Sequence, residues 1–297
     1  MDGAGDGSGT GTGVECEHGA GRARERRRAD ARHHRQDARA NALTCIVVPQ
    51  LDFNCDLGEG CGNDAAIVPL VSSASIACGG HAGDAKSMRD TVALCLQHDV
   101  AIGAHPSFED RVHFGRRELD VDADAIADLV KRQVETLASI CADAGTRLNH
   151  VKPHGALYNV SARDRAVADA VASAVRELDP SLILFGLSGS CLTDAGRAQG
   201  LQVAHEVFAE RAYDADGRLA PRGSPGAVIE DLDASLGQVK LLLRDGVVIA
   251  RDGSRVRLHA DTVCLHGDRR DAVAFAGALR HALESEGIRV HAPERAQ

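Results

Sequence analysis

The stretch LDFNCDLGEGCG, residues 51–62, joins a short apolar run to a Gly-rich turn that carries two carboxylates. Residues 51–56 have the length and apolar content of a buried strand, and Asp56 and Glu59 stand where that strand ends. Glycines at such a turn let the backbone approach a ligand closely. A carboxylate placed there can bind a metal or act as a base. The stretch therefore predicts a strand whose carboxyl end serves a site.

The same unit recurs along the chain beyond residue 51. Short apolar runs alternate with longer segments of helical period, which is typical of α/β folds. We expect strands at 51–56, 73–78, 100–104, 148–152, 182–188, 201–208 and 261–266. We expect helices at 84–98, 123–144, 164–178, 190–199, 235–244 and 269–285. This alternation suits either a closed parallel (β/α) barrel of about seven strands or an open sheet.

Polar clusters follow six of the seven predicted strands. They are Asn54 and Asp56 with Glu59, His81 with Asp84, His105, Lys152 with His154, His205 with Glu206, and His266 with Asp268. In a parallel barrel the carboxyl ends of all strands open on one face, so these side chains would converge there. Any one of them could instead cap the following helix, as Asp84 could, but that explanation is weak for six strands together. The clusters favour a barrel enzyme.

Two segments interrupt the barrel pattern, and one precedes it. Residues 209–231 are polar and rich in Gly and Pro, and 246–258 are expected to form a hairpin around Asp252-Gly253, so both look like insertions on a single domain at 50–297. Residues 1–49 are Gly-rich and then Arg-rich without apolar periodicity, which predicts disorder. We favour a solvated tail or a translated leader over an RNA-binding or partner-binding arm.

Composition narrows the class of protein. The chain has 297 residues and a net charge of −9, so we expect no nucleic-acid partner. No run of 18 apolar residues occurs, and the first 20 residues lack the apolar middle of a secretory signal; we therefore expect a cytoplasmic protein with no membrane partner. Nine dispersed cysteines without a CxxC spacing argue against a disulfide framework or a zinc ribbon.

Individual motifs suggest anion binding and proton transfer. The turn CGGHAGD at 78–84 could hold an anion at a helix N-terminus, although no Gly-Lys-Ser/Thr of a Walker loop occurs in the chain. Arg116 and Arg117 could clamp a carboxylate or phosphate, or one of them could pair with a surface acid. Lys152 lies in an apolar strand, where burial would lower its pKa and make it an acid/base candidate or an anion anchor.

At these residues the sequence resembles the LamB/YcsF family. The resemblance rests on segments that cover most of 51–290 in order: DFNCDLGEGCG at 52–62, SIACGGHAGD at 75–84, IGAHPSFEDRVHFGRR at 102–117, HVKPHGALYN at 150–159, EVFAERAYDADGRLAPR at 206–222 and CLHGD at 264–268. Three departures touch the expected pocket: Ser75 stands where the family usually has Asn, Gly80 where it usually has Phe, and Glu210 where it usually has Asp.

The resemblance implies a deacetylase-like barrel. It also implies a subunit that works with two further subunits in the ATP-dependent hydrolysis of the lactam 5-oxo-L-proline to L-glutamate. Because no Walker loop is present, ATP would be bound in an unrecognised way or through a partner. The alternatives are a stand-alone metal-dependent deacetylase or amidase on the same barrel, and a non-catalytic binding subunit.

Candidate roles follow from the chemistry of a stabilised amide, which needs its carbonyl polarised or phosphorylated before water attacks. The expected catalytic residues are Asp56, Glu59, Lys152 and His154. The expected substrate-binding residues are Asn54, His81, His105, Arg116, Arg117, Glu206, His266 and Asp268. By analogy with deacetylases of similar barrel type, Asp56, His81 and His105 form a hypothetical divalent-metal set.

Overall fold

A computed structural model describes residues 8, 49–269 and 271–296. The expectation of disorder over 1–49 lies outside the described residues, apart from Ser8 and Pro49. The division of the chain at residue 50 stays a prediction. Among the described helices, none combines the length and the apolar character needed to cross a lipid bilayer.

Seven parallel strands close into a barrel. Their order is β1-β2-β3-β4-β5-β6-β9, and β9 pairs in turn with β1. This confirms the predicted parallel barrel, and each expected strand is present. The bounds are β1 (Gln50–Leu57), β2 (Ser73–Ala77), β3 (Ala101–His105), β4 (His150–Val151), β5 (Ile183–Leu187), β6 (Gln202–Phe208) and β9 (Thr262–His266).

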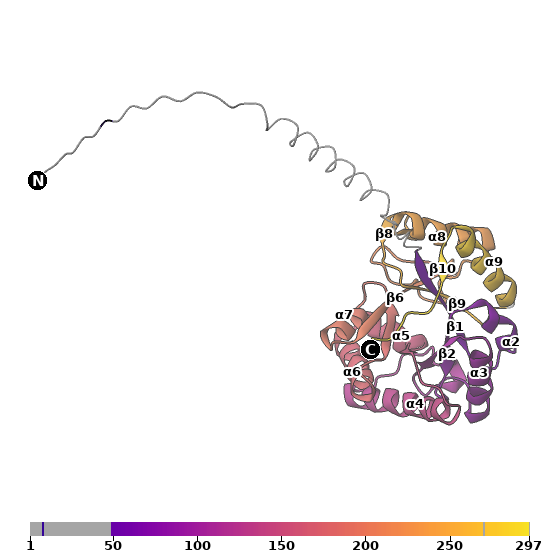
Figure 1. The fold of residues 1–297 in the computed structure, drawn as a ribbon, viewed down its shortest axis with the longest axis vertical. Helices are drawn as coiled ribbons and strands as arrows, with labels where there is room; N and C mark the ends of the chain where they lie inside the picture. Colours follow the sequence, from indigo (N-terminus) through magenta and orange to yellow (C-terminus); the bar gives the residue numbers. More distant parts are fainter. Residues whose placement is uncertain (1–7, 9–48, 270, 297) are drawn as a thin grey trace, which may run out of the picture. The chain divides into compact units, whose positions relative to one another are not determined.

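Helices surround the strands, as Figure 1 shows. They are α2 (Asp64–Ile67), α3 (Ala85–Gln97), α4 (Ala123–Asp143), α5 (Gly155–Arg163), α6 (Arg165–Leu178), α7 (Cys191–Ala198), α8 (Leu232–Asp245) and α9 (Ala272–Ser285), with 3₁₀ turns η1 (Val68–Leu70) and η2 (Arg111–His113). All six expected helices are present. Helices α2 and α5 were not expected, since both are too short to show a helical period of their own.

The two predicted insertions differ in structure. Strands β7 (Val247–Ile249) and β8 (Arg255–Arg257) form the expected antiparallel hairpin. Residues 209–231 are irregular, with two isolated bridges, Arg211 with Val228 and Tyr213 with Leu219. A short unexpected strand, β10 (Arg289–Val290), pairs in parallel with the first residues of β1.

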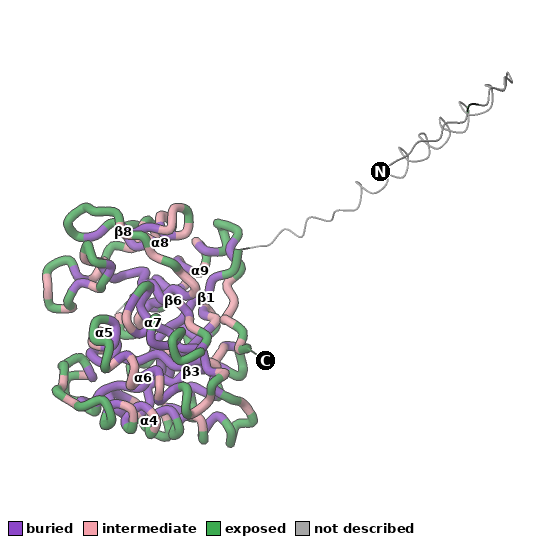
Figure 2. The backbone as a smooth tube through the Cα atoms, turned by 90° about the vertical axis from the view of Figure 1, so that its left-hand side faces the viewer, coloured by how far each residue is buried: buried purple, intermediate pink, exposed green. Residues whose placement is uncertain are grey.

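The strands form the buried centre of the molecule, and exposed residues lie mostly on the surrounding loops and helices (Figure 2). Inside the barrel, the ring of His150 stacks on Phe185 at 4.0 Å. Gly103 permits this packing, because a Cβ at that position would lie 2.1 Å from His150 Nε2. The cysteines in the described ranges are free, and five of them, Cys55, Cys78, Cys95, Cys141 and Cys264, are buried.

Candidate active site

The carboxyl ends of the strands bring together most of the predicted site residues. Asn54 and Asp56 come from β1, His105 from β3, Glu206 from β6 and His266 from β9. His81 follows β2, and Lys152 and His154 follow β4. All of these side chains are buried except that of His266, which is nearly so. The alternation of strand and helix therefore places residues that are distant in sequence in one cluster.

Lys152 belongs to this cluster, and its ammonium group contacts three of its side chains. Its Nζ is 2.6 Å from Asp56 Oδ1 and 2.8 Å from Glu206 Oε1, and it donates a hydrogen bond of 2.8 Å to Asn54 Oδ1. Burial by itself would lower the pKa of Lys152, but Asp56 and Glu206 outweigh it and hold the pKa above its usual range. The expected lowering of this pKa is therefore wrong, because the sequence does not show the two carboxylates.

Asp56 links the lysine to two histidines. Its Oδ2 lies 3.3 Å from His105 Nε2 and 4.0 Å from His266 Nε2. Burial alone would raise the pKa of Asp56, but His105 and Lys152 outweigh burial and hold it well below its usual range. Asp56 is therefore a buried carboxylate that stays charged.

Three histidines and Glu59 gather beside Asp56. His81 stacks on His154 with ring centroids 3.6 Å apart, and Glu59 Oε1 lies 3.1 Å from His81 Nε2 and 3.5 Å from His154 Nδ1. Burial lowers the pKa of His81 to about 2 and that of His154 well below its usual range. Burial and the charge of Asp56 raise the pKa of Glu59. Both imidazoles are thus neutral at pH 7.

Backbone carbonyls fix the protonation of two of these rings. His105 Nδ1 donates to Lys152 O at 2.7 Å, and His154 Nε2 donates to Phe114 O at 3.0 Å. A carbonyl oxygen only accepts hydrogen bonds, so both rings carry a proton on these nitrogens, and their second ring nitrogens are His105 Nε2 and His154 Nδ1. These two atoms face each other at 2.9 Å. The neutral ring of His154 has a lone pair on Nδ1, so a proton on His105 Nε2 or a cation must lie between the two atoms.

Ligand atoms of Glu59, His81, His105 and His154 lie within 4.8 Å of one another and could hold a metal ion. Two members of the expected set, His81 and His105, belong to this group. Asp56 belongs instead to a second group, with Cys264 and His266. The sequence did not indicate that Glu59 and His154 belong to such a group, because the paths of the two turns that carry them determine whether they lie near the other ligands.

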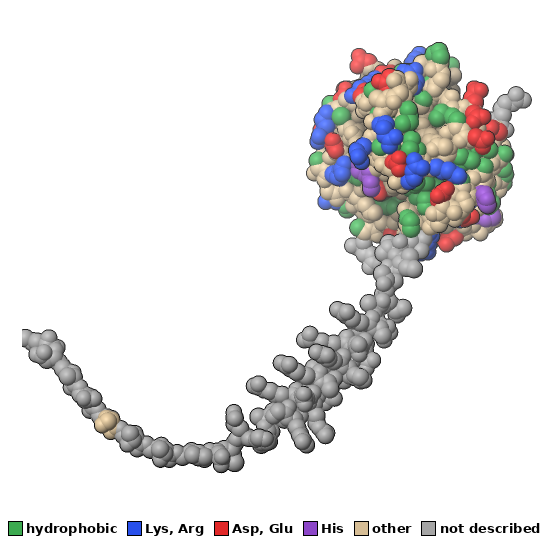
Figure 3. Space-filling model, turned by 90° about the horizontal axis from the view of Figure 1, so that it is seen from above, with side chains coloured by type: hydrophobic (Ala, Val, Ile, Leu, Met, Phe, Trp, Pro, Cys, Tyr) green, Lys and Arg blue, Asp and Glu red, His purple; other side chains and the backbone are tan. Residues whose placement is uncertain are grey.

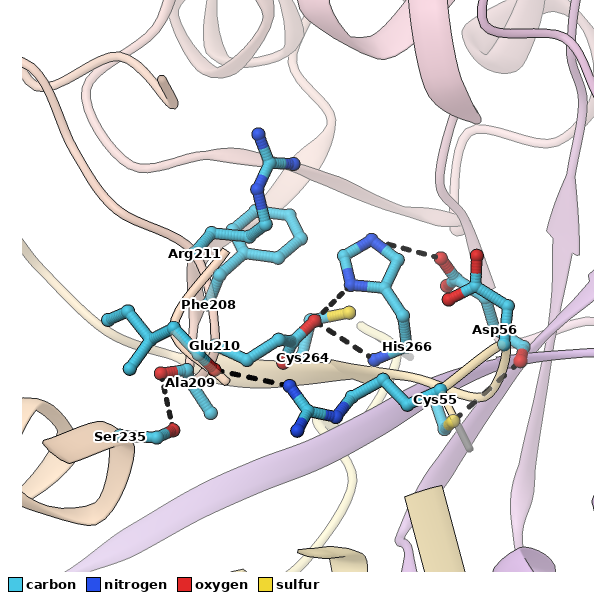
Figure 4. A network of polar contacts seen from close by, with 12 residues as sticks. Cys55, Asp56, Phe208, Ala209, Glu210, Arg211, Ser235, Cys264 and His266 are labelled. Carbon is cyan, nitrogen blue, oxygen red and sulfur yellow. Dashed lines mark hydrogen bonds and ion pairs between the residues drawn. The ribbon is translucent and has the colours of Figure 1, made fainter. Parts of the chain in front are cut away.

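His266 lies between two carboxylates (Figure 4). Its Nδ1 contacts Glu210 Oε1, and its Nε2 faces Asp56. Burial lowers the pKa of His266, although Glu210 opposes this effect. The ring also stacks on Phe208, with centroids 5.5 Å apart. Glu210 thus orients His266 toward Asp56.

The structure separates the two arginines that were expected to clamp an anion. Arg116 borders the site, where it pairs with Asp268 and lies over the Phe114 ring at 4.8 Å. Arg117 is exposed, and its nearest carboxylate is Asp110, at 3.6 Å. Arg117 therefore does not join the cluster. Asp84 and His205 also lie apart: Asp84 caps α3, and His205 packs against His259.

Two cavities adjoin the cluster. The smaller, about 30 Å³, is lined by Asp56, His105, Lys152, His154 and His266 among others. The larger, about 240 Å³, lies between α5 and the irregular segment 209–231. Tyr158, Asn159, Leu219 and Arg222 line the smaller cavity as well, and sequence reasoning missed all four. Only the motifs HGALYN and GRLAPR could have pointed to them.

Comparisons with known proteins agree with this arrangement. The LamB/YcsF family model matches residues 51–297. The chain is 52% identical over 249 residues to a protein of Bordetella pertussis named as a 5-oxoprolinase subunit, covering 82% of this chain and 99% of that protein; the match to a like-named protein of Bordetella bronchiseptica has the same identity and coverage. The crystal structure of a "Lactam Utilization Protein" from Thermus thermophilus aligns with a TM-score of 0.77 and 42% identity, covering 82% of this chain and 100% of that one. The chain belongs to the LamB/YcsF family.

Proposed function

We propose that this chain is the lactam-opening subunit of an ATP-dependent 5-oxoprolinase, which hydrolyses 5-oxo-L-proline to L-glutamate. The names of relatives at 52% identity support this substrate. The observation that carries the proposal is the buried Asp56–Lys152–Glu206 cluster beside three histidines at the carboxyl end of the barrel. A purely structural barrel has no need of so many desolvated ionisable groups on one cavity.

A divalent cation fits the group formed by Glu59, His81, His105 and His154. The fit is supported by the unprotonated Nδ1 of His154, which faces His105 Nε2 at 2.9 Å, and by the carboxylate of Glu59 beside it. When bound, such an ion would polarise an amide carbonyl and lower the pKa of water. The backbone carbonyls of Phe114 and Lys152 orient two of the ligands, as metal-binding histidines require.

Asp56 is the proposed base. Lys152 and His105 keep it deprotonated, so it can accept a hydrogen bond from the attacking water and take its proton as the carbon–oxygen bond forms, although the same two cations make it a weaker base than an ordinary aspartate. Lys152 itself has no free role as a proton donor, because two carboxylates and Asn54 hold its ammonium group. We assign Lys152 to positioning Asp56.

His266 is the proposed carrier of that proton to the departing nitrogen. Its Nε2 faces Asp56 Oδ2 at 4.0 Å, and its Nδ1 is held by Glu210. As the carbon–nitrogen bond breaks, the proton taken by Asp56 passes through His266 to the amine, and the new carbon–oxygen bond completes the carboxylate of glutamate. Water supplies the oxygen of that bond. A phosphoryl group transferred from ATP to the lactam oxygen would remain as an acyl phosphate when the ring opens, and a second water would release it as inorganic phosphate.

ATP is proposed to act through partner subunits. The chain contains no Gly-Lys-Ser/Thr sequence, and the relatives are named as one subunit of their enzyme. The face seen in Figure 3 carries interspersed acidic and basic side chains rather than a field of one sign. We propose that two further subunits activate the lactam with ATP and that this chain completes its hydrolysis.

The test is glutamate release from 5-oxo-L-proline by the full chain, alone and mixed with partner subunits, with and without ATP. We expect release only in the complete mixture with ATP. Release by the chain alone, without ATP, would favour the stand-alone metal-dependent amidase, which the metal-binding group also fits.

A further inference from the structure

The volumes of the two cavities indicate that the substrate occupies both of them. The cavity at the catalytic cluster, about 30 Å³, has room for a few water-sized groups, since a single water needs roughly 10–15 Å³. A five-membered ring with a carboxylate does not fit there as a whole. The neighbouring cavity, about 240 Å³, shares Arg116, Gly155, Asn159, Leu219 and Arg222 with the small one, so the two adjoin. A substrate with its carbonyl at Asp56 therefore extends into the larger cavity.

The larger cavity is lined by four arginines, and three of them already have acidic partners. Arg116 pairs with Asp268, Arg163 with Glu118 at 2.6 Å and Arg218 with Asp216 at 3.4 Å. For Arg222, the described residues provide neither an ion pair nor a hydrogen bond to its side chain. Arg222 is thus the cation of this cavity whose charge is not compensated by a direct partner.

The position of Arg222 makes that charge effective. It lines both cavities, at their junction, and is partly buried. Burial, followed by the proximity of Arg116, lowers the pKa of Arg222. A partly desolvated guanidinium favours an anionic partner, and a carboxylate can receive two of its hydrogen bonds in parallel. Two other buried cations line the small cavity, and both are engaged. Asp56 and Glu206 hold Lys152, and the guanidinium of Arg211 donates hydrogen bonds to the carbonyl oxygens of Ala220 and Ala227.

We infer that Arg222 binds the carboxylate of the substrate and so selects cyclic amides that carry an acid group over neutral lactams. This inference deepens the proposed function and rests on it. The lactam carbonyl then lies in the small cavity beside Asp56, and the ring carbon that bears the carboxylate lies at the junction. The irregular segment 209–231, which carries Arg222, thus determines which lactams bind, and the residues at the strand ends carry out the hydrolysis.

The test is equilibrium binding to the full chain by titration calorimetry, which needs neither ATP nor partners. The ligands are 5-oxo-L-proline, the neutral lactam 2-pyrrolidinone and inorganic phosphate. The variant is Arg222→Gln, with Arg163→Gln as the matched control, because Arg163 lines the same cavity but is paired with Glu118. Arg222→Lys keeps the charge and serves as a second variant.

We expect Arg222→Gln to weaken binding of 5-oxo-L-proline by about 10- to 100-fold, the usual effect of losing a charge-assisted hydrogen-bond pair. Arg163→Gln should change the affinity for 5-oxo-L-proline by less than about twofold. Arg222→Lys should weaken binding less than Arg222→Gln does. The affinity for 2-pyrrolidinone should be the same in wild type and in Arg222→Gln. The inference is overturned if wild type does not bind 5-oxo-L-proline, if the two Gln variants bind it alike, or if Arg222→Gln abolishes phosphate binding only. Turnover by the partner mixture, measured separately, tests the proposed function whatever Arg222 does.

Discussion

One lysine balances two buried carboxylates at the centre of the site. Lys152 lies within 2.8 Å of both Asp56 and Glu206, and all three side chains are at least 96% buried. Removing one member of a buried ion pair leaves the other charge desolvated and uncompensated. The lysine therefore serves stability and chemistry together.

We expect Lys152→Gln to lower the free energy of unfolding by about 3–5 kcal/mol at neutral pH, because Asp56 and Glu206 lose their cation. Urea denaturation measures this change. Lys131→Gln is the control: Lys131 pairs with Glu177 on the surface, and its loss should cost less than about 1 kcal/mol. Equal losses in the two variants would show that Lys152 is not compensating buried charge.

A second residue-scale prediction concerns Asp52, at the opposite end of the barrel. Burial raises its pKa from 3.8 to about 6, although hydrogen bonds from Ser72 and Thr262 oppose the shift. The folded state thus holds this proton more tightly than the unfolded chain. The stabilisation is complete below about pH 4 and is lost as the pH rises through about 6.

We expect wild type to lose about 3 kcal/mol of stability relative to Asp52→Asn between about pH 4 and pH 7, from a shift of about two pKa units. Urea unfolding of both proteins across this range measures the difference. Asp52→Asn need not be as stable as wild type, because the prediction concerns only how the difference in their free energies of unfolding changes with pH. A difference that stays constant with pH would contradict the prediction.

Single residues at strand ends could be predicted from the sequence, because each follows an apolar run. The sequence located Asp56, His105 and Lys152 in this way, and the structure brings them together. It could not indicate the direction of the pKa shift of Lys152, which depends on carboxylates from other strands. Nor could it indicate Arg222, since no periodicity describes the path of an irregular loop.

At the scale of elements, helix α5 holds the loop that borders the site. The N–H of Ala156 donates to Gly115 O at 2.9 Å, and Gly155 has a φ of +55°. A Cβ on Gly155 would lie 2.5 Å from Gly115 O, a backbone atom that cannot move without the loop. This contact fixes the position of Phe114 and Arg116 relative to the histidines.

We expect Gly155→Ala to be more destabilising than Gly145→Ala. Gly145 follows α4 with a φ of +73°, and a Cβ added there would have no neighbour within 4 Å, so alanine costs only the backbone strain, about 1 kcal/mol. Gly155→Ala adds a steric cost of about 1–3 kcal/mol and should also lower turnover, because it displaces Arg116. Thermal unfolding and glutamate release measure the two effects. Similar behaviour of both variants would contradict the role assigned to α5.

Longer elements were predictable where shorter ones were not. Helices α4 and α6 have the apolar spacing that packs one face on the barrel, and the sequence showed both. Helix α5 begins directly after Pro153 and His154 and is joined to α6 by the single residue Asp164, which caps α6. Its nine residues offer little periodicity.

At the scale of the whole molecule, the barrel gathers four possible metal ligands from segments that β2, β3 and β4 and the turn after β1 provide. We expect the purified chain to bind about one equivalent of a divalent metal, as such His-rich sites do, and His154→Ala to lose it. Plasma mass spectrometry measures the metal content. His205→Ala is the control, because His205 lies at a strand of the same barrel but packs on His259.

Full activity in chelator, together with no stoichiometric metal in wild type, would show that the reaction does not need a metal ion. It would leave Asp56, Lys152 and His266 in place, since their contacts do not depend on it. The comparison of His154→Ala with His205→Ala separates a loss of metal from a general loss of fold.

We propose that the lactam is opened at Asp56. It is tested most directly by glutamate release from 5-oxo-L-proline in the complete mixture with ATP, using Asp56→Asn and, as control, Asp84→Asn, an exposed helix cap that asparagine can also fill. Unfolding and partner binding of both variants are measured alongside. We expect a loss of about 10²- to 10⁴-fold for Asp56→Asn, as for removal of a general base, and near-normal release for Asp84→Asn. Folded, partner-bound Asp56→Asn that releases glutamate at the wild-type rate would contradict it.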